Sequence, residues 1–413
     1  MREAISSSRP ALRLRELPRN VWAVTITSFL TDVSSEMLIN LIPLFLANVL
    51  GVGMEIVGLI EGVAETTASL LKVFSGWLSD RLRQRKWLAV LGYALSTVAK
   101  PFLFFANHWG WVLAVRFTDR VGKGVRTSPR DALVADSVDP AHRGLAFGLH
   151  RAGDTAGAVV GLLIALGVVW STQATGRTLT RPTFQTVVLF SVIPAALAVL
   201  VLALAAHDVP VKREASPPSL TLRGFDRHFK LFLLTVVLFT LGNSSDAFLI
   251  LRGQERGLSV LGVLGMLITF NGVYTMVSGP AGALSDRLGR RRLIVGGWLV
   301  YGLIYLGFAL ARTGWQVWAL FTLYGIYYGM VEGTARALVA DLVRPAQRGT
   351  AYGVYNAAVG LTAFPASFIA GLLWRYIGPA APFTFGALMA LLAVGLLMLW
   401  LPGKQDIPNS FQG

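Results

Sequence analysis

Charged side chains gather on one face of an otherwise apolar segment, residues 109–134. Seven of them occur between residues 116 and 131: Arg116, Asp119, Arg120, Lys123, Arg126, Arg130 and Asp131. At about 100° per residue, they share one face of an α-helix. In a membrane helix, a charge at the bilayer centre costs about 2.5–3.5 kcal/mol, so this face must contact a partner or line a wet cavity. We interpret Arg116 to Lys123 as a site for an anion or a coupling network, and Arg126 and Arg130 as gate residues. A plain salt-bridged helix buried between its neighbours is the alternative.

Other apolar segments carry isolated polar side chains. They are Asp32 and Glu36, Glu61 and Glu65, His150 with Arg151 and Asp154, Asn243 and Asp246, and Glu332 and Arg336. A carboxylate that alternates between an unpaired buried setting and a setting beside an arginine can bind and release a proton, because the two settings shift its pKa in opposite directions. His150 has an ordinary pKa of about 6.5 and could also carry a proton. The alternatives are a satisfied core histidine and, for Glu332 and Arg336, an ion pair within one helix.

The composition indicates a membrane protein. Of 413 residues, 54% are hydrophobic and 14% are charged, whereas a soluble domain carries about 25% charged residues. The net charge of +15 could indicate a protein that binds nucleic acid. Its basic residues, however, form short clusters between apolar runs, which is typical of the positive-inside rule. We therefore expect the protein to lie in a lipid bilayer and not to bind nucleic acid. The absence of cysteine excludes disulfides and thiolate metal sites, and we expect no cofactor.

Twelve segments are long and apolar enough for membrane helices, which need about 20 residues. They are residues 21–49, 54–78, 87–106, 109–134, 144–169, 184–206, 229–252, 258–283, 291–311, 315–341, 349–374 and 381–401. The sequence therefore predicts an all-α membrane protein with twelve transmembrane helices in two pseudo-symmetric six-helix bundles, residues 21–206 and 229–402. Residues 207–228 have the polar, basic composition of a linker. We expect residues 1–20 to be an arm without a cleavable signal peptide, and residues 403–413 to be a tail.

The basic clusters set the expected orientation. The loop after residue 78 contains Arg81, Arg83, Arg85 and Lys86, and the loop after residue 283 contains Arg287 and Arg290 to Arg292. With twelve spans, both loops, the arm and the linker lie on one side. Both termini are then cytoplasmic in a cell (inner) membrane.

Two segments of the first half recur in the second half. GWLSDRLRQRK at 76–86 returns as GALSDRLGRRR at 282–292, and ALVADSVDPAHRGLAFG at 132–148 returns as ALVADLVRPAQRGTAYG at 337–353. The two repeats have nearly the same offset, so whole halves match. Parallel duplication of six-helix units is common in transporters, whose substrate site lies between the halves.

The repeated loops resemble the signature G-x-L-[SA]-D-R-x-G-R-[RK] of the major facilitator superfamily. The second copy fits fully, and the first has Arg83 and Gln84 where Gly and Arg are usual. RFTDRVGKG at 116–124 resembles a motif of drug–proton antiporters, from which it departs at Asp119, Arg120 and Lys123. AGDTAGAVVGLL at 152–163 is related to a second antiporter motif, whose glycines it keeps without the proline. The resemblance covers residues 21–402.

The resemblance implies roles for several residues. The family fold places segments 21–49, 109–134, 229–252 and 315–341 around a central cavity. The signature loops act as latches on the cytoplasmic side, and their candidate gate residues are Gly76, Asp80, Arg81, Gly282, Asp286 and Arg287. Arg126 or Arg130 is the expected partner of Asp80. The glycines at 153, 157 and 161 could equally serve close helix packing alone.

These observations favour a secondary transporter, and we expect a monomer whose partners are a small-molecule substrate and protons. We expect proton-coupled efflux of a small anionic or zwitterionic solute, with Asp32, Glu36, Asp119 and Asp154 as coupling candidates. The alternative is a divalent metal exporter that uses Asp32, Glu36, Glu65 and Asp246 as oxygen ligands. A receptor would be expected to add a soluble domain. A membrane enzyme is disfavoured because no nucleotide loop, nucleophile elbow or metal-ligand motif occurs.

Overall fold

The computed structural model describes residues 14–139, 142–209, 221–344 and 347–400, and over these ranges the chain forms helices and no strand. A 3-10 turn (Leu14–Glu16) precedes the first half, which consists of α1 (Arg19–Ile39), α2 (Ile42–Leu44), a π-helical turn η2 (Phe45–Val49), α3 (Met54–Leu82), α4 (Lys86–Ala99), a 3-10 turn η3 (Lys100–Phe105), α5 (Trp109–Ser137), α6 (Arg143–Gln173) and α7 (Arg181–Ala205). The second half consists of α8 (Arg227–Gly242), α9 (Ala247–Glu255), α10 (Val260–Leu288), α11 (Arg290–Leu310), α12 (Gly314–Asp341), α13 (Arg348–Tyr376) and α14 (Ala381–Trp400).

Nine stretches of the described chain are long and apolar enough to cross a membrane. The predicted segments that fall outside this set correspond to α3, α5 and α12. These helices are as long as their neighbours, but α3 and α5 carry the charged side chains predicted to line a site, and tyrosines lower the hydropathy of α12. The protein is therefore an all-helical multi-pass membrane protein.

Two predicted segments are broken rather than continuous. The segment 229–252 divides into α8 and α9 at residues 243–246, where Asn, Ser and Asp side chains compete for backbone hydrogen bonds. The freed amide of Ser245 donates to Ser367 Oγ of α13 (3.2 Å), and the amide of Ala247 donates to Ser245 Oγ (3.2 Å). The segment 21–49 breaks after Ile39, where Pro43 starts the short α2. Within a bilayer, such breaks occur where neighbouring protein groups satisfy the backbone.

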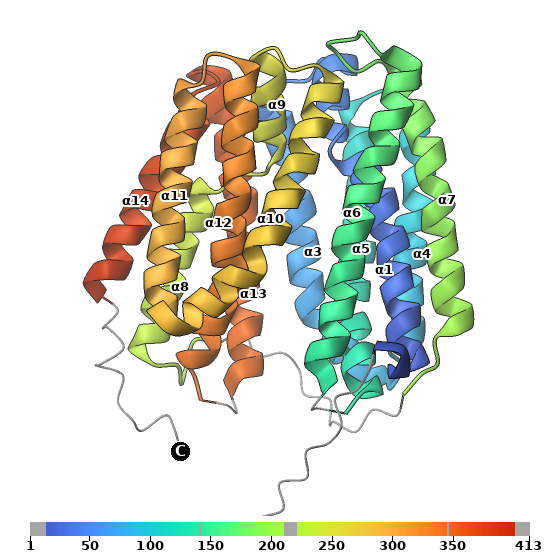
Figure 1. Ribbon diagram of the computed structural model, residues 1–413, viewed down its shortest axis with the longest axis vertical. Coiled ribbons are helices and arrows are strands. Elements are labelled where there is room, and N and C mark those ends of the chain that lie inside the picture. The colour runs from blue at the N-terminus through green and yellow to red at the C-terminus, as the bar shows by residue number, and fades with distance from the viewer. Residues whose placement is uncertain (1–13, 140–141, 210–220, 345–346, 401–413) are drawn as a thin grey trace, which may run out of the picture.

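The helices pack mainly within their own half. In the first half, α1 packs on α6 and α7, and α3 and α4 pack on α5. In the second half, α12 packs on α10 and α11, and α14 packs on α8 and α11. The halves meet mainly along two seams, α3 with α13 and α6 with α10, and α2 also contacts α9. Figure 1 shows the two groups of helices side by side.

The described chain ends lie together. The start of α1, the end of α7, the start of α8 and the end of α14 are all at the lower end of the molecule in Figure 1. The turns after α3 and α10 are at the same end, and we call it the basic end. Most of the expected arm, linker and tail (residues 1–13, 210–220 and 401–413) lies outside the described residues.

The glycines at 153, 157 and 161 serve helix packing. A Cβ at Gly153 would lie 2.8 Å from Thr25 Cγ2, and a Cβ at Gly157 or Gly161 would overlap a backbone carbonyl of α1. Four-residue spacing on α6 thus matches four-residue spacing on α1 (Thr25, Phe29 and Val33). The packing interpretation of these glycines is confirmed.

Candidate functional site

The carboxylates that pair with Arg116 and Arg120 of α5 come from α3. Arg116 Nη2 lies 2.7 Å from both carboxylate oxygens of Glu61, and both side chains are buried. One turn further, Arg120 Nη2 lies 3.3 Å from Glu65 Oε1. Arg120 is buried, but the Glu65 side chain is 45% exposed. Both acids therefore come from α3, which packs along α5.

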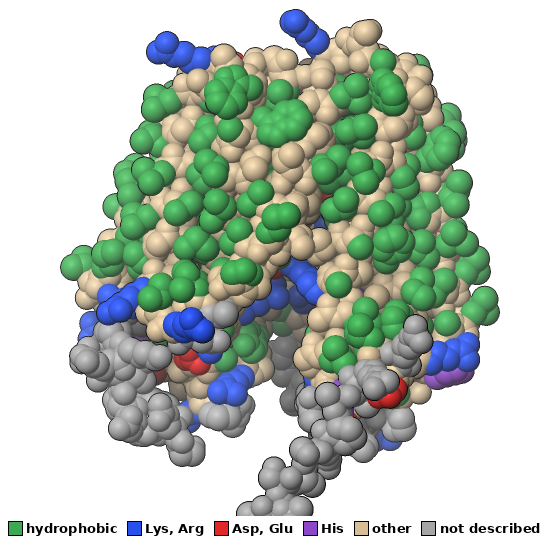
Figure 2. All heavy atoms as spheres, viewed as in Figure 1, with side chains coloured by type: hydrophobic (Ala, Val, Ile, Leu, Met, Phe, Trp, Pro, Cys, Tyr) green, Lys and Arg blue, Asp and Glu red, His purple; other side chains and the backbone are tan. Residues whose placement is uncertain are grey.

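Lys123 is the α5 cation that remains accessible. Its side chain is exposed, while Arg116 and Arg120 are buried. It lies within electrostatic range of Asp32 on α1 and of Glu65 on α3. Figure 2 shows Lys and Arg side chains in a hollow between the two groups of helices, in the lower part of this face. Asp246 of the second half lies within electrostatic range of Glu36, Glu61 and Glu65, so this charged region borders the second half.

Asp32 and Glu36 of α1 approach this charged region. Asp32 is within electrostatic range of Asp154, Glu36, Arg130 and Lys123. Glu36 accepts a hydrogen bond from Asn40 Nδ2 (2.9 Å). Asp119 is within electrostatic range of the cations Arg120 and Lys100. The structure therefore brings the predicted α1 and α5 residues into one charged region.

Lys100 belongs to the same region, and sequence analysis missed it. Its Nζ donates to Ser34 Oγ (2.6 Å) and to Ser35 Oγ (3.1 Å), and its side chain is buried. Lys100 also lies within electrostatic range of Asp32 and Glu36. A lysine inside the apolar segment 87–106 was the available signal.

His150 and Asp154 lie on the same face of α6. The two side chains are 3.6 Å apart (Nδ1 to Oδ1), which exceeds hydrogen-bond distance. His150 is buried, and within the described chain neither ring nitrogen has a hydrogen-bond partner. A satisfied core histidine does not fit this environment.

In the second half, an aromatic cluster surrounds the break between α8 and α9. Tyr324 Oη lies 3.3 Å from Asn243 Oδ1 and 3.4 Å from Asp246 Oδ1. Its ring packs against those of the other cluster members, which are Tyr301, Tyr305, Tyr327 and Tyr328. Sequence analysis identified Asn243 and Asp246 but missed the tyrosines, for which the run YGIYYG at 324–329 was a signal.

Glu332 links the halves rather than serving only its own helix. It accepts a 2.8 Å hydrogen bond from Tyr274 Oη of α10 and lies 3.4 Å from Arg151 Nη2 of α6. Arg336 is more distant, at 3.9 Å. The plain intrahelical pair is therefore the weakest of these contacts, and Arg151 is a further member of the site.

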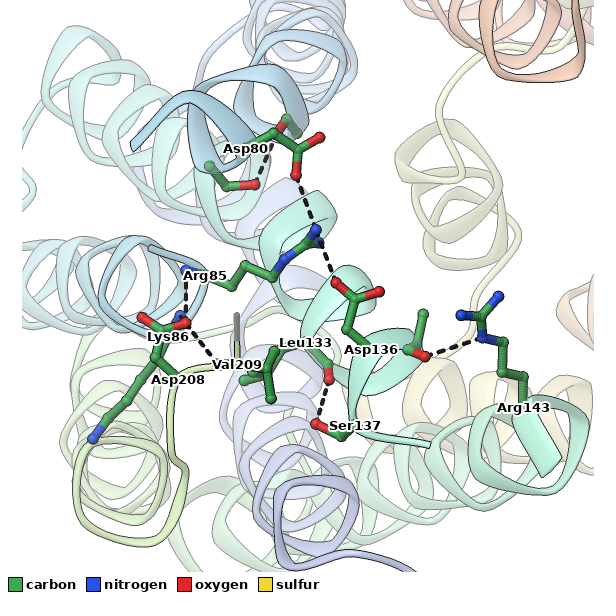
Figure 3. Close-up of polar contacts among 12 residues, drawn as sticks. Asp80, Arg85, Lys86, Leu133, Asp136, Ser137, Arg143, Asp208 and Val209 are labelled. Carbon is green, nitrogen blue, oxygen red and sulfur yellow. Dashed lines mark hydrogen bonds and ion pairs between the residues drawn. The ribbon is translucent and has the colours of Figure 1, made fainter. Parts of the chain in front are cut away.

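Arg85 is the partner of Asp80 at the basic end. Arg85 Nη2 lies 3.0 Å from Asp80 Oδ1 and 2.9 Å from Asp136 Oδ2, and the arginine side chain is buried (Figure 3). A cavity of about 120 Å³ adjoins these residues and Gly76. The second half has a related pair, Arg290 Nε with Asp341 Oδ2 at 3.1 Å. Asp136 and Asp341 occupy matching positions of the ALVAD repeat, and this repeat was the signal for them.

The predicted partners of Asp80 bond elsewhere. Arg126 Nη1 donates to Ser96 Oγ (2.8 Å), and its guanidinium lies over the Tyr93 ring. Arg130 bonds Asp131 (2.8 Å) and Ser28 Oγ (3.1 Å). The pairing of Asp80 with Arg126 or Arg130 is therefore wrong. The α3 turn brings Arg85 back over its own helix end, nearer than either α5 arginine.

The remaining gate candidates differ between the two loops. Arg81 lies over the Trp77 ring, and Arg287 is exposed in the last turn of α10. A Cβ at Gly282 would meet no neighbour among the described residues. The side chain of Asp286 lies outside the described part of the structure.

The halves also meet at the opposite end, along α3 and α13. Glu55 at the start of α3 forms an ion pair with Arg375 at the end of α13. Deeper in the seam, a Cβ at Gly62 would lie 3.0 Å from the Phe364 backbone, and Thr66 Oγ1 donates to the Gly360 carbonyl (2.6 Å). The α3–α13 seam thus begins at the end of the molecule opposite to the basic end.

Taken together, the fold and the site define a helical membrane protein with a charge-lined region between two halves that contact each other along two seams. The chain belongs to the major facilitator superfamily, whose family model matches residues 24–279 and 231–412. Like other members, it is a transporter of small molecules and not an enzyme.

Similar proteins agree with this assignment. An uncharacterised MFS-type transporter of Methanocaldococcus jannaschii is 36% identical over 94% of this chain and 96% of its own length. The multi-drug resistance efflux pump PmrA of Streptococcus pneumoniae is 27% identical over 76% of this chain and 79% of its own. A solved POT family transporter superposes with a TM-score of 0.78 at 12% identity, covering 94% of this chain and 97% of its own.

The metal alternative finds no geometric support in the described residues. No group of three or more His, Cys, Asp or Glu side chains there is placed to hold a metal ion. The four carboxylates considered for a metal site are distributed over α1, α3 and the break before α9.

Proposed function

We propose that this protein is a proton-coupled exporter of a small anionic or zwitterionic solute. The observation that carries this proposal is the charged region between the halves, where Lys123 lies within electrostatic range of Asp32 and Glu65. Both positive and negative side chains occur there, and Arg116 and Arg120 already form ion pairs with acids of α3. This balance favours a zwitterion over a simple anion. Export is supported by the similarity to an efflux pump.

In this proposal, the chain crosses the inner membrane twelve times as a monomer, in two six-helix bundles (residues 21–206 and 229–402). The charged sides of α3 and α5 face each other, which supports both as membrane helices despite their charges. The basic end is cytoplasmic, in keeping with the positive-inside rule. The closed α3–α13 contact at the opposite end then makes this an inward-facing arrangement.

Asp32 and Glu36 are the proposed proton carriers. Both lie within electrostatic range of Lys100 and Lys123, cations that can stabilise their charged forms. Movement of the halves would change the exposure of these carboxylates to water and the distance of Glu36 from Asp246 in the second half, and thereby their proton affinity. Asp119 and Asp154 are the second choices, and Asn243 with Asp246 forms the facing wall.

The proposal is tested in proteoliposomes that contain a pH-sensitive dye. A thermal-stability screen of amino acids, organic acids and antibiotics first identifies stabilising solutes. Addition of such a solute should move protons in vesicles with the wild-type protein but not with Asp32→Asn or Glu36→Gln. Asp226→Asn is the matched control, because that carboxylate is exposed at the start of α8. Unchanged proton movement in both cavity variants would refute the coupling assignment.

A further inference from the structure

A second cavity lies in the second half, at the end opposite to the basic end. It has a volume of about 580 Å³ and is bordered by α9, the end of α13 and the start of α14. Figure 1 shows α9 at the top of the molecule, far from the described chain ends. The cavity shares no lining residue with the charged region assigned to transport.

One side of this cavity carries excess positive charge. Arg252 is fully buried, donates Nε to the Phe308 carbonyl (3.0 Å) and bonds Glu255 Oε2 through Nη1 (2.7 Å). Glu255 Oε2 also lies 3.0 Å from Arg256 Nε. One carboxylate thus pairs with two guanidinium groups, so these three side chains together carry a net charge of +1. Within the described chain, Arg256 has no acidic partner other than Glu255, and its side chain is partly exposed.

The other side is apolar and reaches the surface. Phe385 and Leu388 of α14 line it together with Leu373 and Ile377 near the end of α13. Leu388 is 52% exposed and Ile377 is 74% exposed. Tyr376, which is also largely exposed, is beside them. Exposed aromatic residues at helix ends are typical of the boundary between hydrocarbon and headgroups.

We propose that this cavity binds an anionic phospholipid of the adjacent leaflet. The phosphate would contact Arg256, which shares the Glu255 carboxylate with Arg252 and so is not fully neutralised. An acyl chain would lie along Phe385 and Leu388. A net positive charge beside an exposed apolar wall at headgroup level complements a lipid anion in both charge and polarity. Inorganic phosphate shares the headgroup chemistry but makes no use of the apolar wall.

The experiment uses the purified full-length protein in detergent. Thermal unfolding and native mass spectrometry are recorded with phosphatidylglycerol, with phosphatidylcholine of the same chains, and with sodium phosphate. Phosphatidylglycerol should raise the Tm and remain bound, and its affinity should fall about ten-fold in Arg256→Gln because a charge-assisted contact is lost. Arg312→Gln is the matched control, an exposed arginine at the same end that does not line the cavity.

A second variant protects the test against misfolding of the first. Thr384→Glu places a negative charge at an exposed lining position without touching the arginines, and should also weaken phosphatidylglycerol selectively. Equal responses to both lipids, or equal phosphatidylglycerol affinity in the wild type and both cavity variants, would overturn the proposal. A stabilisation by sodium phosphate equal to that by phosphatidylglycerol would also overturn it, in favour of a free-anion site.

Discussion

Arg151 of α6 lies 3.4 Å from the Glu332 carboxylate of α12 and donates a 2.7 Å hydrogen bond to Tyr274 Oη, which itself donates to Glu332. A single guanidinium thus joins the halves across one seam. The Arg151 side chain is 58% exposed, and exposed ion pairs contribute about 0.2–1 kcal/mol. A link of this strength can form and break as the halves move.

Arg151→Gln or Glu332→Gln should therefore change the balance between inward- and outward-facing forms by up to about five-fold, the equivalent of about 1 kcal/mol. The chain has no cysteine, so spin labels on paired cysteines at the basic ends of α6 and α10 can report the distance distribution. The charge-reversed double variant Arg151→Glu with Glu332→Arg should restore the wild-type distribution. Identical distributions in all variants would show that the bridge is incidental.

The two α3–α5 pairs should differ in their contribution to stability. Glu61 is buried against Arg116, so Glu61→Gln leaves a buried guanidinium unpaired and should cost about 3–5 kcal/mol. Glu65 is half exposed, and Arg120 keeps Asp119, Glu61 and Glu36 within electrostatic range, so Glu65→Gln should cost about 1 kcal/mol or less. Thermal unfolding of both variants measures the difference. The pair variant Glu61→Leu with Arg116→Leu should recover most of the loss, and equal losses for Glu61→Gln and Glu65→Gln would contradict this account.

Arg85 should make the effects of Asp80 and Asp136 strongly non-additive. Asp80→Asn or Asp136→Asn alone leaves the buried guanidinium with one carboxylate, while the double variant leaves it with neither. We expect mild losses of thermal stability for each single variant and a loss for the double that exceeds their sum. If the loop is a latch, solute binding by calorimetry should survive in Asp80→Asn while flux falls. Loss of binding in folded Asp80→Asn protein would refute the latch role.

Packing of α6 on α1 should be sensitive to one added methyl group. In Gly157→Ala, the Cβ would overlap the carbonyl of Phe29, and overpacking of this kind costs about 1–3 kcal/mol. Gly167→Ala is the control on the same helix, where a Cβ meets no described neighbour. It should be neutral or stabilising by up to about 1 kcal/mol. Similar Tm values for both variants would contradict close packing at Gly157.

The first signature turn should be relieved by glycine. Arg83 ends α3 in the left-handed conformation (φ 53°, ψ 29°), whereas the corresponding turn of the second half has Gly289 at φ 91°. Left-handed backbone costs a non-glycine residue about 1–2 kcal/mol, so Arg83→Gly should raise the Tm. Arg81→Gly, inside the last turn of α3, should lower it. A lower Tm in Arg83→Gly would show that the arginine side chain outweighs the backbone strain.

Much of the architecture follows from sequence because the signals are local. Apolar segments of membrane length, together with the basic clusters and duplicated motifs, predicted the helix bounds to within a few residues. The exceptions are the breaks before α2 and α9. The charged face of α5 follows from helical periodicity alone. Gly153, Gly157 and Gly161 likewise indicated a close helix contact from their spacing.

The partners of the charged residues were decided only by the tertiary structure. Helical spacing shows that Arg116 and Arg120 share a face, but not that α3 lies opposite with Glu61 and Glu65. The turn after α3 determines that Arg85, rather than an α5 arginine, reaches Asp80. Periodicity orders side chains around one helix axis, whereas pairing depends on how separate helices pack, rotate and tilt. Those relations arise from long-range contacts that no local pattern encodes.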